Sequence, residues 1–176
     1  MLKNRRGFTL MELVVVVLIM GILASMGVPY YYKTIETSKA TDAVAIAHLI
    51  GSANRMYLVD NPGATISGLI DNSCNNPALT CATAPGACKL VACNYVAKQD
   101  WASSAYNFYA CSNGGGAPCC ANGPAPYNPK GVACVARKAG APVAYANWGY
   151  RFFDDGSCQN IAPLTGLYNQ PPCPKF

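Results

Sequence analysis

A long apolar run dominates the N-terminal part of the chain. From Phe8 to Tyr32 nearly every residue is apolar, and one carboxylate, that of Glu12, lies near the start. As a helix this run would be about 37 Å long, enough to cross a hydrocarbon core about 30 Å thick. A charged side chain near the centre of such a helix costs roughly 2.5–3.5 kcal/mol on insertion scales. Glu12 is therefore a candidate functional residue and is expected to have a partner.

The helical pattern continues beyond the apolar run. Six residues recur at the spacing i, i+3, i+4 and i+7, which is typical of one buried helix face. These are Ile46, Leu49, Ile50, Ala53, Met56 and Tyr57. Asn61-Pro62-Gly63 is a strong stop signal, so we expect one helix over residues 8–60, whose second half packs on the rest of the chain. Pro29 should bend this helix because proline lacks an amide donor, and Gly21 lowers the local helix propensity.

Alternation of apolar and polar residues predicts β-strands in the C-terminal half of the chain. Strands are expected at Tyr106–Cys111, Gly131–Lys138, Asn147–Phe153 and Ser157–Ile161. A tight turn that contains Asp-Gly joins the last two. Residues 61–91 are rich in Pro, Gly, Asn, Thr and Ala and are predicted to form loops. A long helix packed on a small antiparallel sheet of three to five strands is an α+β fold.

Ten cysteines follow the apolar segment and none precedes it. An even number beyond a segment of membrane length is typical of disulfides formed in an oxidising compartment. A metal site is the alternative, but the sequence has no CxxC pair and its one histidine, His48, lies in the predicted helix. Spacing does not determine the pairs, although the adjacent Cys119 and Cys120 should bond different partners. The full set is Cys74, Cys81, Cys88, Cys93, Cys111, Cys119, Cys120, Cys134, Cys158 and Cys173.

The charge of the chain is concentrated at its start. The formal net charge is +5, and Lys3, Arg5 and Arg6 supply three of the positive charges. Without residues 1–7 there are 10 Lys and Arg against 8 Asp and Glu, which is a net charge of +2. No basic cluster with interleaved aromatic residues appears, so nucleic-acid binding is not indicated.

Catalytic and cofactor motifs are not recognisable in the sequence. No nucleophile and acid accompany His48 in a catalytic pattern, and there is no paired-carboxylate motif or phosphate-binding loop. We therefore expect no enzyme activity, no cofactor and no metal. Asp154-Asp155-Gly156-Ser157 could be a calcium loop, but the EF-hand pattern is absent and a hairpin turn is the better interpretation.

Two ordinary membrane-targeting explanations exist for the N-terminal segment. A cleaved secretory signal is one, but the apolar part exceeds the usual ~7–15 residues, contains Glu12, and lacks a clean small-x-small cleavage site. A plain transmembrane anchor is the other. Its length is suitable, and Lys3, Arg5 and Arg6 would keep its N-terminus cytoplasmic. This anchor, however, leaves Glu12 without a partner.

The sequence RRGFTLMELVVVVLIMGILA resembles the N-terminus of type IV pilins and of the related pseudopilins. The resemblance implies that a prepilin peptidase cleaves after Gly7 and that the new N-terminal residue, Phe8, is N-methylated. Glu12 matches the family's glutamate at the fifth position after the cut. Gly21 and Pro29 match its helix-weakening glycine and proline. The resemblance is specific in this segment and fades across the cysteine-rich remainder.

The same resemblance implies a mode of assembly and a domain organisation. The charged amine of Phe8 in one subunit would meet Glu12 of a neighbour in a filament core, where an unpaired buried charge penalises wrong axial registers. Residues 1–7 would be a leader peptide, and residues 8–60 a long helix whose first part, residues 8–32, lies in the membrane or the filament core. Residues 61–176 would form a cysteine-rich head.

Three functions remain open within this resemblance. The chain would be the structural subunit of a type IV pilus that serves adhesion, motility or DNA uptake, a low-copy minor pilin, or a pseudopilin of a type II secretion system. The high cysteine content and an expected C-terminal disulfide between Cys158 and Cys173 favour the pilus. The implied partners are identical subunits in a helical homopolymer, the prepilin peptidase and the pilus assembly machinery. The precursor would be a single-pass inner-membrane protein, and the pilus would lie on the cell surface.

Overall fold

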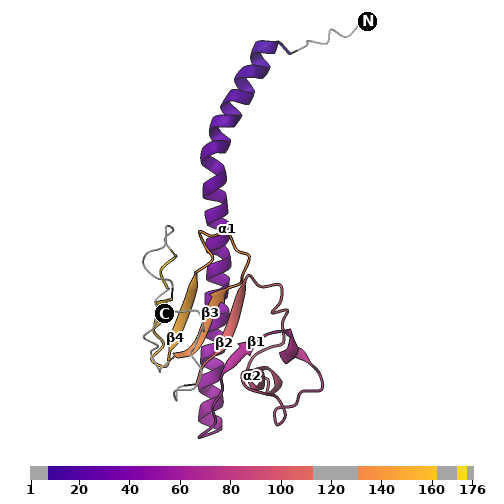
Figure 1. The fold of residues 1–176 in the computed structure, drawn as a ribbon, viewed down its shortest axis with the longest axis vertical. Helices are drawn as coiled ribbons and strands as arrows, with labels where there is room; N and C mark the ends of the chain where they lie inside the picture. The colour runs from indigo at the N-terminus through magenta and orange to yellow at the C-terminus, as the bar shows by residue number, and fades with distance from the viewer. Residues whose placement is uncertain (1–7, 113–130, 162–169, 174–176) are drawn as a thin grey trace, which may run out of the picture. The chain divides into compact units, whose positions relative to one another are not determined.

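The computed structural model describes residues 8–112, 131–161 and 170–173 of the chain (Figure 1). Its elements are α1 (Leu10–Asp60), β1 (Gly68–Ile70), η1 (Asn72–Asn75), α2 (Cys88–Ala92), β2 (Tyr106–Ala110), β3 (Gly131–Arg137), β4 (Gly149–Phe153) and β5 (Cys158–Asn160). The residues form two compact units, Met1–Ser38 and Lys39–Phe176. Helix α1 contributes to both units, and each is described by itself.

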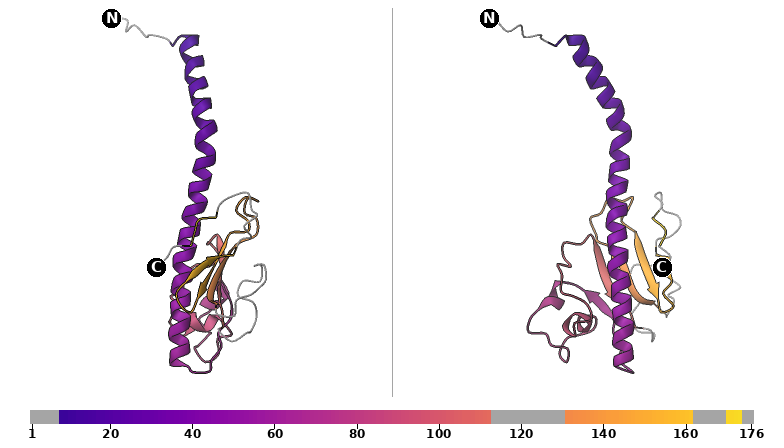
Figure 2. Two further views of the ribbon diagram at one scale, coloured as in Figure 1. Left: turned by 90° about the vertical axis from the view of Figure 1, so that its left-hand side faces the viewer. Right: turned by 180° about the vertical axis from the view of Figure 1, so that it is seen from behind.

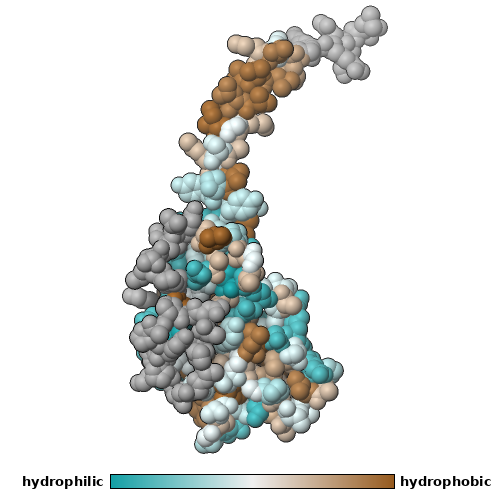
Figure 3. All heavy atoms as spheres, viewed as in Figure 1, coloured by the Kyte–Doolittle hydropathy of each residue, from teal (hydrophilic) through white to brown (hydrophobic). Residues whose placement is uncertain are grey.

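The first unit consists of the N-terminal part of α1, which is apolar on all its faces. Every large apolar side chain from Phe8 to Tyr32 is at least 46% exposed. Figure 3 shows the start of this helix as an apolar surface, which is followed along the helix by paler and more hydrophilic residues. Among the described residues, α1 is the one helix that is long and apolar enough to cross a membrane. A helix that is apolar all round is stable only when lipid or protein covers it. The helix itself continues through Pro29.

The second unit contains a five-stranded antiparallel sheet in the order β1-β2-β3-β4-β5. On one face the register places Phe108, Val135 and Tyr150 side by side, and all three are buried. The α+β fold predicted from the sequence is confirmed, and the four expected strands are present with ends that differ by one or two residues. Strand residues of this kind are typical of a pleated face that packs on a helix.

The C-terminal part of α1 lies against one face of this sheet (Figure 2). Gly51 makes the close approach possible, because a Cβ atom at this position would lie 3.2 Å from Cγ2 of Val132. One turn further along the helix, Asn54 is completely buried. Its amide Nδ2 donates to the backbone carbonyls of Cys111 at 2.8 Å and Val132 at 2.9 Å. These two residues hold the helix in one register on the sheet.

The prediction of loops over residues 61–91 is wrong in part, because this range contains β1, η1 and the start of α2. Each of these elements is too short for hydrophobic periodicity to reveal it. Local bonds form them instead: the carboxylate of Asp71 accepts a hydrogen bond from the Ser73 amide at 2.9 Å and caps η1. The disulfide between Cys74 and Cys88, with Cα atoms 4.7 Å apart, then joins η1 to α2.

Disulfides hold the long irregular segments of the second unit. Cys158 of β5 bonds Cys173, the pair that the resemblance to pilins implies. Beside this bond, the Gln170 side chain donates to the carbonyl of Gly149 at 2.6 Å, which ties the segment to β4. Cys81 bonds Cys93. Cys111 and Cys134 are each in a disulfide as well. Cys119 and Cys120 lie outside the described residues.

Candidate functional site

The predicted functional carboxylate, Glu12, forms a capping box with Thr9 at the start of α1. The backbone amide and the hydroxyl of Thr9 donate to Oε2 of Glu12 at 2.9 Å and 2.8 Å. The Glu12 amide donates in return to Oγ1 of Thr9 at 3.3 Å. The reciprocal bonds between an N-cap threonine and a glutamate three residues later satisfy amides that the helix leaves unpaired at its start.

Sequence reasoning missed this partner of Glu12. The pattern Thr9-Leu10-Met11-Glu12 is the signal that could have found it, because threonine followed by glutamate three residues later is a helix-start signature. Both hydrogen bonds from Thr9 go to Oε2 of Glu12, and Oε1 accepts no hydrogen bond from the described residues. Glu12 therefore has an acceptor left for a second donor. The adjacent Phe8 is 84% exposed, whereas Gly7 lies outside the described residues.

The two residues predicted to weaken the helix lie at open positions of α1. A Cβ atom on Gly21 would meet nothing within 4 Å, so no close packing among the described residues explains the glycine. Pro29 is followed by Tyr30, Tyr31 and Tyr32, which are all exposed. Exposed tyrosines at the end of an apolar helix are typical of a membrane interface.

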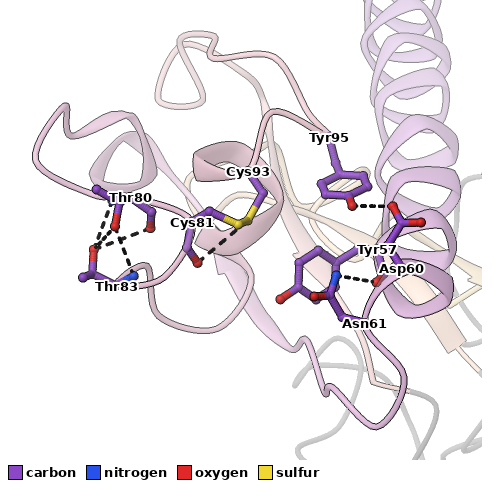
Figure 4. Close-up of a disulfide and its surroundings, with 8 residues drawn as sticks. All are labelled: Tyr57, Asp60, Asn61, Thr80, Cys81, Thr83, Cys93 and Tyr95. Carbon is purple, nitrogen blue, oxygen red and sulfur yellow. Dashed lines mark hydrogen bonds between the residues drawn. A yellow bond between two sulfur atoms is a disulfide. The ribbon is translucent and has the colours of Figure 1, made fainter.

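At the other end of α1, a hydrogen bond ties the helix to the disulfide-bonded segment after it. The Tyr95 hydroxyl donates to Oδ2 of Asp60, and the rings of Tyr57 and Tyr95 meet edge to face at 5.4 Å. Figure 4 shows the Tyr95 hydroxyl pointing toward Asp60, together with Tyr57 and the Cys81–Cys93 disulfide. The bond to Asp60 is the largest cause of a raised pKa of Tyr95, because loss of the proton would remove the bond and place two negative charges together.

Replacing Tyr95 by Phe should remove a stabilising contribution that depends on pH. Since the pKa of Tyr95 is raised in the folded state, this contribution is fully present below the unfolded pKa near ~10 and is lost as pH rises through the higher folded value. The difference in urea midpoint between wild type and Tyr95→Phe should therefore be constant near neutral pH and shrink at alkaline pH. A difference that grows at alkaline pH would contradict the assigned bond.

The hairpin between β4 and β5 has the geometry of a plain turn. Oδ1 of Asp155 accepts a hydrogen bond from the Ser157 amide at 2.8 Å, and Gly156 has a φ of +83°, which glycine adopts readily. Within the ranges that the structure describes, no group of three His, Cys, Asp or Glu side chains could hold a metal ion. The exposed N-terminal segment of α1, which contains the capped Glu12, is the candidate functional site.

Residues 2–28 match the prokaryotic N-terminal methylation motif, and this comparison decides the nature of the segment. The match includes Gly7, Phe8 and the capping box of Thr9 and Glu12. It confirms the resemblance of the chain to type IV pilins and pseudopilins.

Curated relatives of both kinds are similar to part of the chain. The type II secretion system core protein G of Pseudomonas aeruginosa is 41% identical over 59 residues, which are 34% of this chain and 42% of the relative. The protein of the same name from Escherichia coli is 40% identical over 58 residues, 33% of this chain and 40% of the relative. The type IV major fimbrial protein FimA of Dichelobacter nodosus is 46% identical over 43 residues, 24% of this chain and 27% of the relative.

The similarity covers a minority of each protein. The chain spans about two fifths of the secretion relatives and about a quarter of FimA. No solved structure matches the chain.

Proposed function

We propose that this chain is the structural subunit of a type IV pilus and polymerises through the N-terminal part of α1. The observation that carries the proposal is an apolar helix, exposed on all faces, that begins with the methylation motif and a capped Glu12. Outside the membrane, such a helix is expected to be stable only when other apolar helices cover it in a filament core. The disulfide-bonded second unit would form the outer surface of the filament, where it would serve adhesion, motility or DNA uptake.

Processing and assembly follow from the same proposal. The precursor would lie in the inner membrane with residues 1–7 in the cytoplasm, and a prepilin peptidase would cleave between Gly7 and Phe8. Methylation of the new amine of Phe8 leaves it charged, so it can donate to the acceptor of Glu12 that the capping box leaves open. The assembly machinery would then extract the subunit, with Gly21 and Pro29 as the points at which the helix can extend.

A pseudopilin of a type II secretion system is the second candidate function. The similarity to the core protein G of two organisms favours it. A pseudopilin would use the same cleavage, methylation and helix packing, and it would form a short periplasmic assembly in place of a surface filament. A minor pilin, present in few copies, would also be processed in this way.

Mass spectrometry of sheared surface filaments tests the proposal. The dominant species, analysed without reduction, should begin with N-methylated Phe8 and should be lighter by ten hydrogens than the reduced chain, because all ten cysteines would be in disulfides. A species that begins at Met1 would contradict the cleavage site. Correctly processed protein that is found only in the cell envelope, or as a trace in the sheared fraction, would favour the pseudopilin or the minor pilin.

A further inference from the structure

A cleft of about 490 Å³ lies inside the second unit, between α1 and the segment of residues 99–105, which we call the cleft segment. Lys39, Asp42 and Ile46 contribute one side of it, and their spacing of three and four residues places them on one face of the helix. Ile46 supplies apolar surface, and Phe108 of β2, which also lines the cleft, is buried. The volume lies within the range of small-molecule sites.

The cleft segment is held rigidly by side chains from other parts of the fold. The Asn72 side chain accepts from the amide of Trp101 at 2.8 Å and donates to Oδ1 of Asp100 at 2.9 Å. From the opposite direction, the ammonium group of Lys138 donates to the carbonyls of Trp101 at 3.0 Å and Ala102 at 2.9 Å. A loop fixed in this way loses little conformational entropy when a ligand binds, and such preorganisation favours affinity.

Trp101 lines the cleft with a side chain that is almost fully buried. The residue is only 2% exposed, and its indole Nε1 is buried without a hydrogen-bond partner among the described residues. Its ring meets the ring of Phe108 edge to face at 5.6 Å. The indole of Trp101 can therefore report on a ligand in the cleft through a change in its surroundings, without a direct bond to Nε1.

Several polar groups around the cleft have bonding capacity that the fold does not use. Asp42 makes no hydrogen bond or ion pair among the described residues, and Asp100 uses Oδ1 for the bonds from Asn72 and Ala102. The bond from Asn72 is the largest cause of the lowered pKa of Asp100, which stays ionised at neutral pH. The hydroxyl of Ser104 accepts from the Tyr106 amide at 3.2 Å and keeps its own proton to donate.

We propose that this cleft binds a neutral saccharide. Two carboxylates accept hydrogen bonds from sugar hydroxyls, the Ser104 hydroxyl and the Gln99 amide donate to them, and the carbon face of the ring lies against the apolar side of the cleft. An anion would be repelled by Asp42 and Asp100. An organic cation would be attracted by both carboxylates, but it would offer no acceptor to the donors of Ser104 and Gln99. A neutral ligand with both donors and acceptors matches all these groups.

The test uses the full-length protein in micelles of a detergent whose headgroup carries no sugar. This form contains the cleft and does not require filament assembly, so the result is independent of the proposed pilus function. The protein has two tryptophans, Trp101 at the cleft and Trp148 away from it. Each gives a separate indole N–H signal in a nitrogen-15 NMR spectrum. Titration with galactose, glucose and N-acetylglucosamine should shift the Trp101 signal saturably for at least one sugar and leave the Trp148 signal in place.

Two matched variants make the assignment specific. Asp42→Asn should weaken saccharide binding about tenfold, the effect expected for loss of a hydrogen bond to a charged group. Asp154→Asn makes the same change in charge outside the cleft and should leave the affinity unchanged. The proposal is overturned if none of the three sugars shifts the Trp101 signal, if both variants weaken binding equally, or if n-butylammonium shifts the signal and the sugars do not.

Discussion

Replacing Glu12 by Gln should reduce the amount of assembled filament by roughly tenfold or more, while cleavage of the precursor continues. Glutamine is the informative substitute because it also serves at the third position of a capping box. The bonds from Thr9 to this side chain would therefore remain, and only the negative charge would be removed. Loss of one partner of a buried ion pair costs about 3–5 kcal/mol, and each 1.4 kcal/mol corresponds to about a factor of ten.

The control for this experiment is Thr9→Val, which removes the cap and keeps the charge of Glu12. Loss of an N-cap costs about 0.5–2 kcal/mol of helix stability, so assembly should fall much less than in the glutamine variant. Both variants are measured by quantifying sheared filaments and the cleaved subunit that remains in the membrane. Wild-type amounts of filament from Glu12→Gln, or an equal loss in both variants, would show that the charge does not direct assembly and that Glu12 acts through the cap.

Replacing Asn54 by Asp should lower the free energy of unfolding at neutral pH by about 3–5 kcal/mol, the cost of an uncompensated buried charge. The two side chains have nearly the same shape, so packing is preserved. The carboxylate, however, has no proton to donate to the carbonyls of Cys111 and Val132. It would instead place a negative charge in a completely buried position that faces two carbonyl oxygens.

The stability of this variant should also acquire a distinctive pH dependence. Burial raises the pKa of such a carboxyl in the folded state. The stability of Asn54→Asp should therefore be greatest below the unfolded pKa near ~3.9 and fall as pH rises through the folded value. Urea unfolding of the full chain in micelles over a pH series measures this. Asn107→Asp, the same substitution at a half-buried position of β2, should show neither effect, and equal loss in both variants would contradict the special role of Asn54.

Hydrophobic pattern predicted the longest element of this fold and most of its sheet. The prediction of a helix over residues 8–60 depends on a continuous apolar run in its first part and on a periodic apolar stripe over residues 46–57 in its second part. The short elements β1, η1 and α2 escaped prediction because each has only three to five residues. A side-chain cap starts η1 and a disulfide joins η1 to α2, and the pairs that disulfides join cannot be read from spacing.

The sequence names the residues of the proposed assembly site, and their role in assembly stays a prediction, whereas the structure shows the bond that Glu12 makes. The pattern around Gly7, Phe8 and Glu12 is contiguous, so the sequence displays it completely. The hydrogen bonds from Thr9 to Glu12 are also local in sequence. They were missed because the partner of Glu12 was sought only in another subunit.

The sequence by itself determined a membrane-length apolar helix, which carries the N-terminal methylation motif, and a cysteine-rich α+β unit after it. The physical reason is that composition, periodicity and short motifs act between residues close together in the chain. Only the tertiary structure decided the register that Asn54 sets between α1 and β3, and the cleft that brings Asp42 together with Asp100. Those features join residues far apart in sequence, and their energies depend on burial and distance, which exist only once the chain has folded.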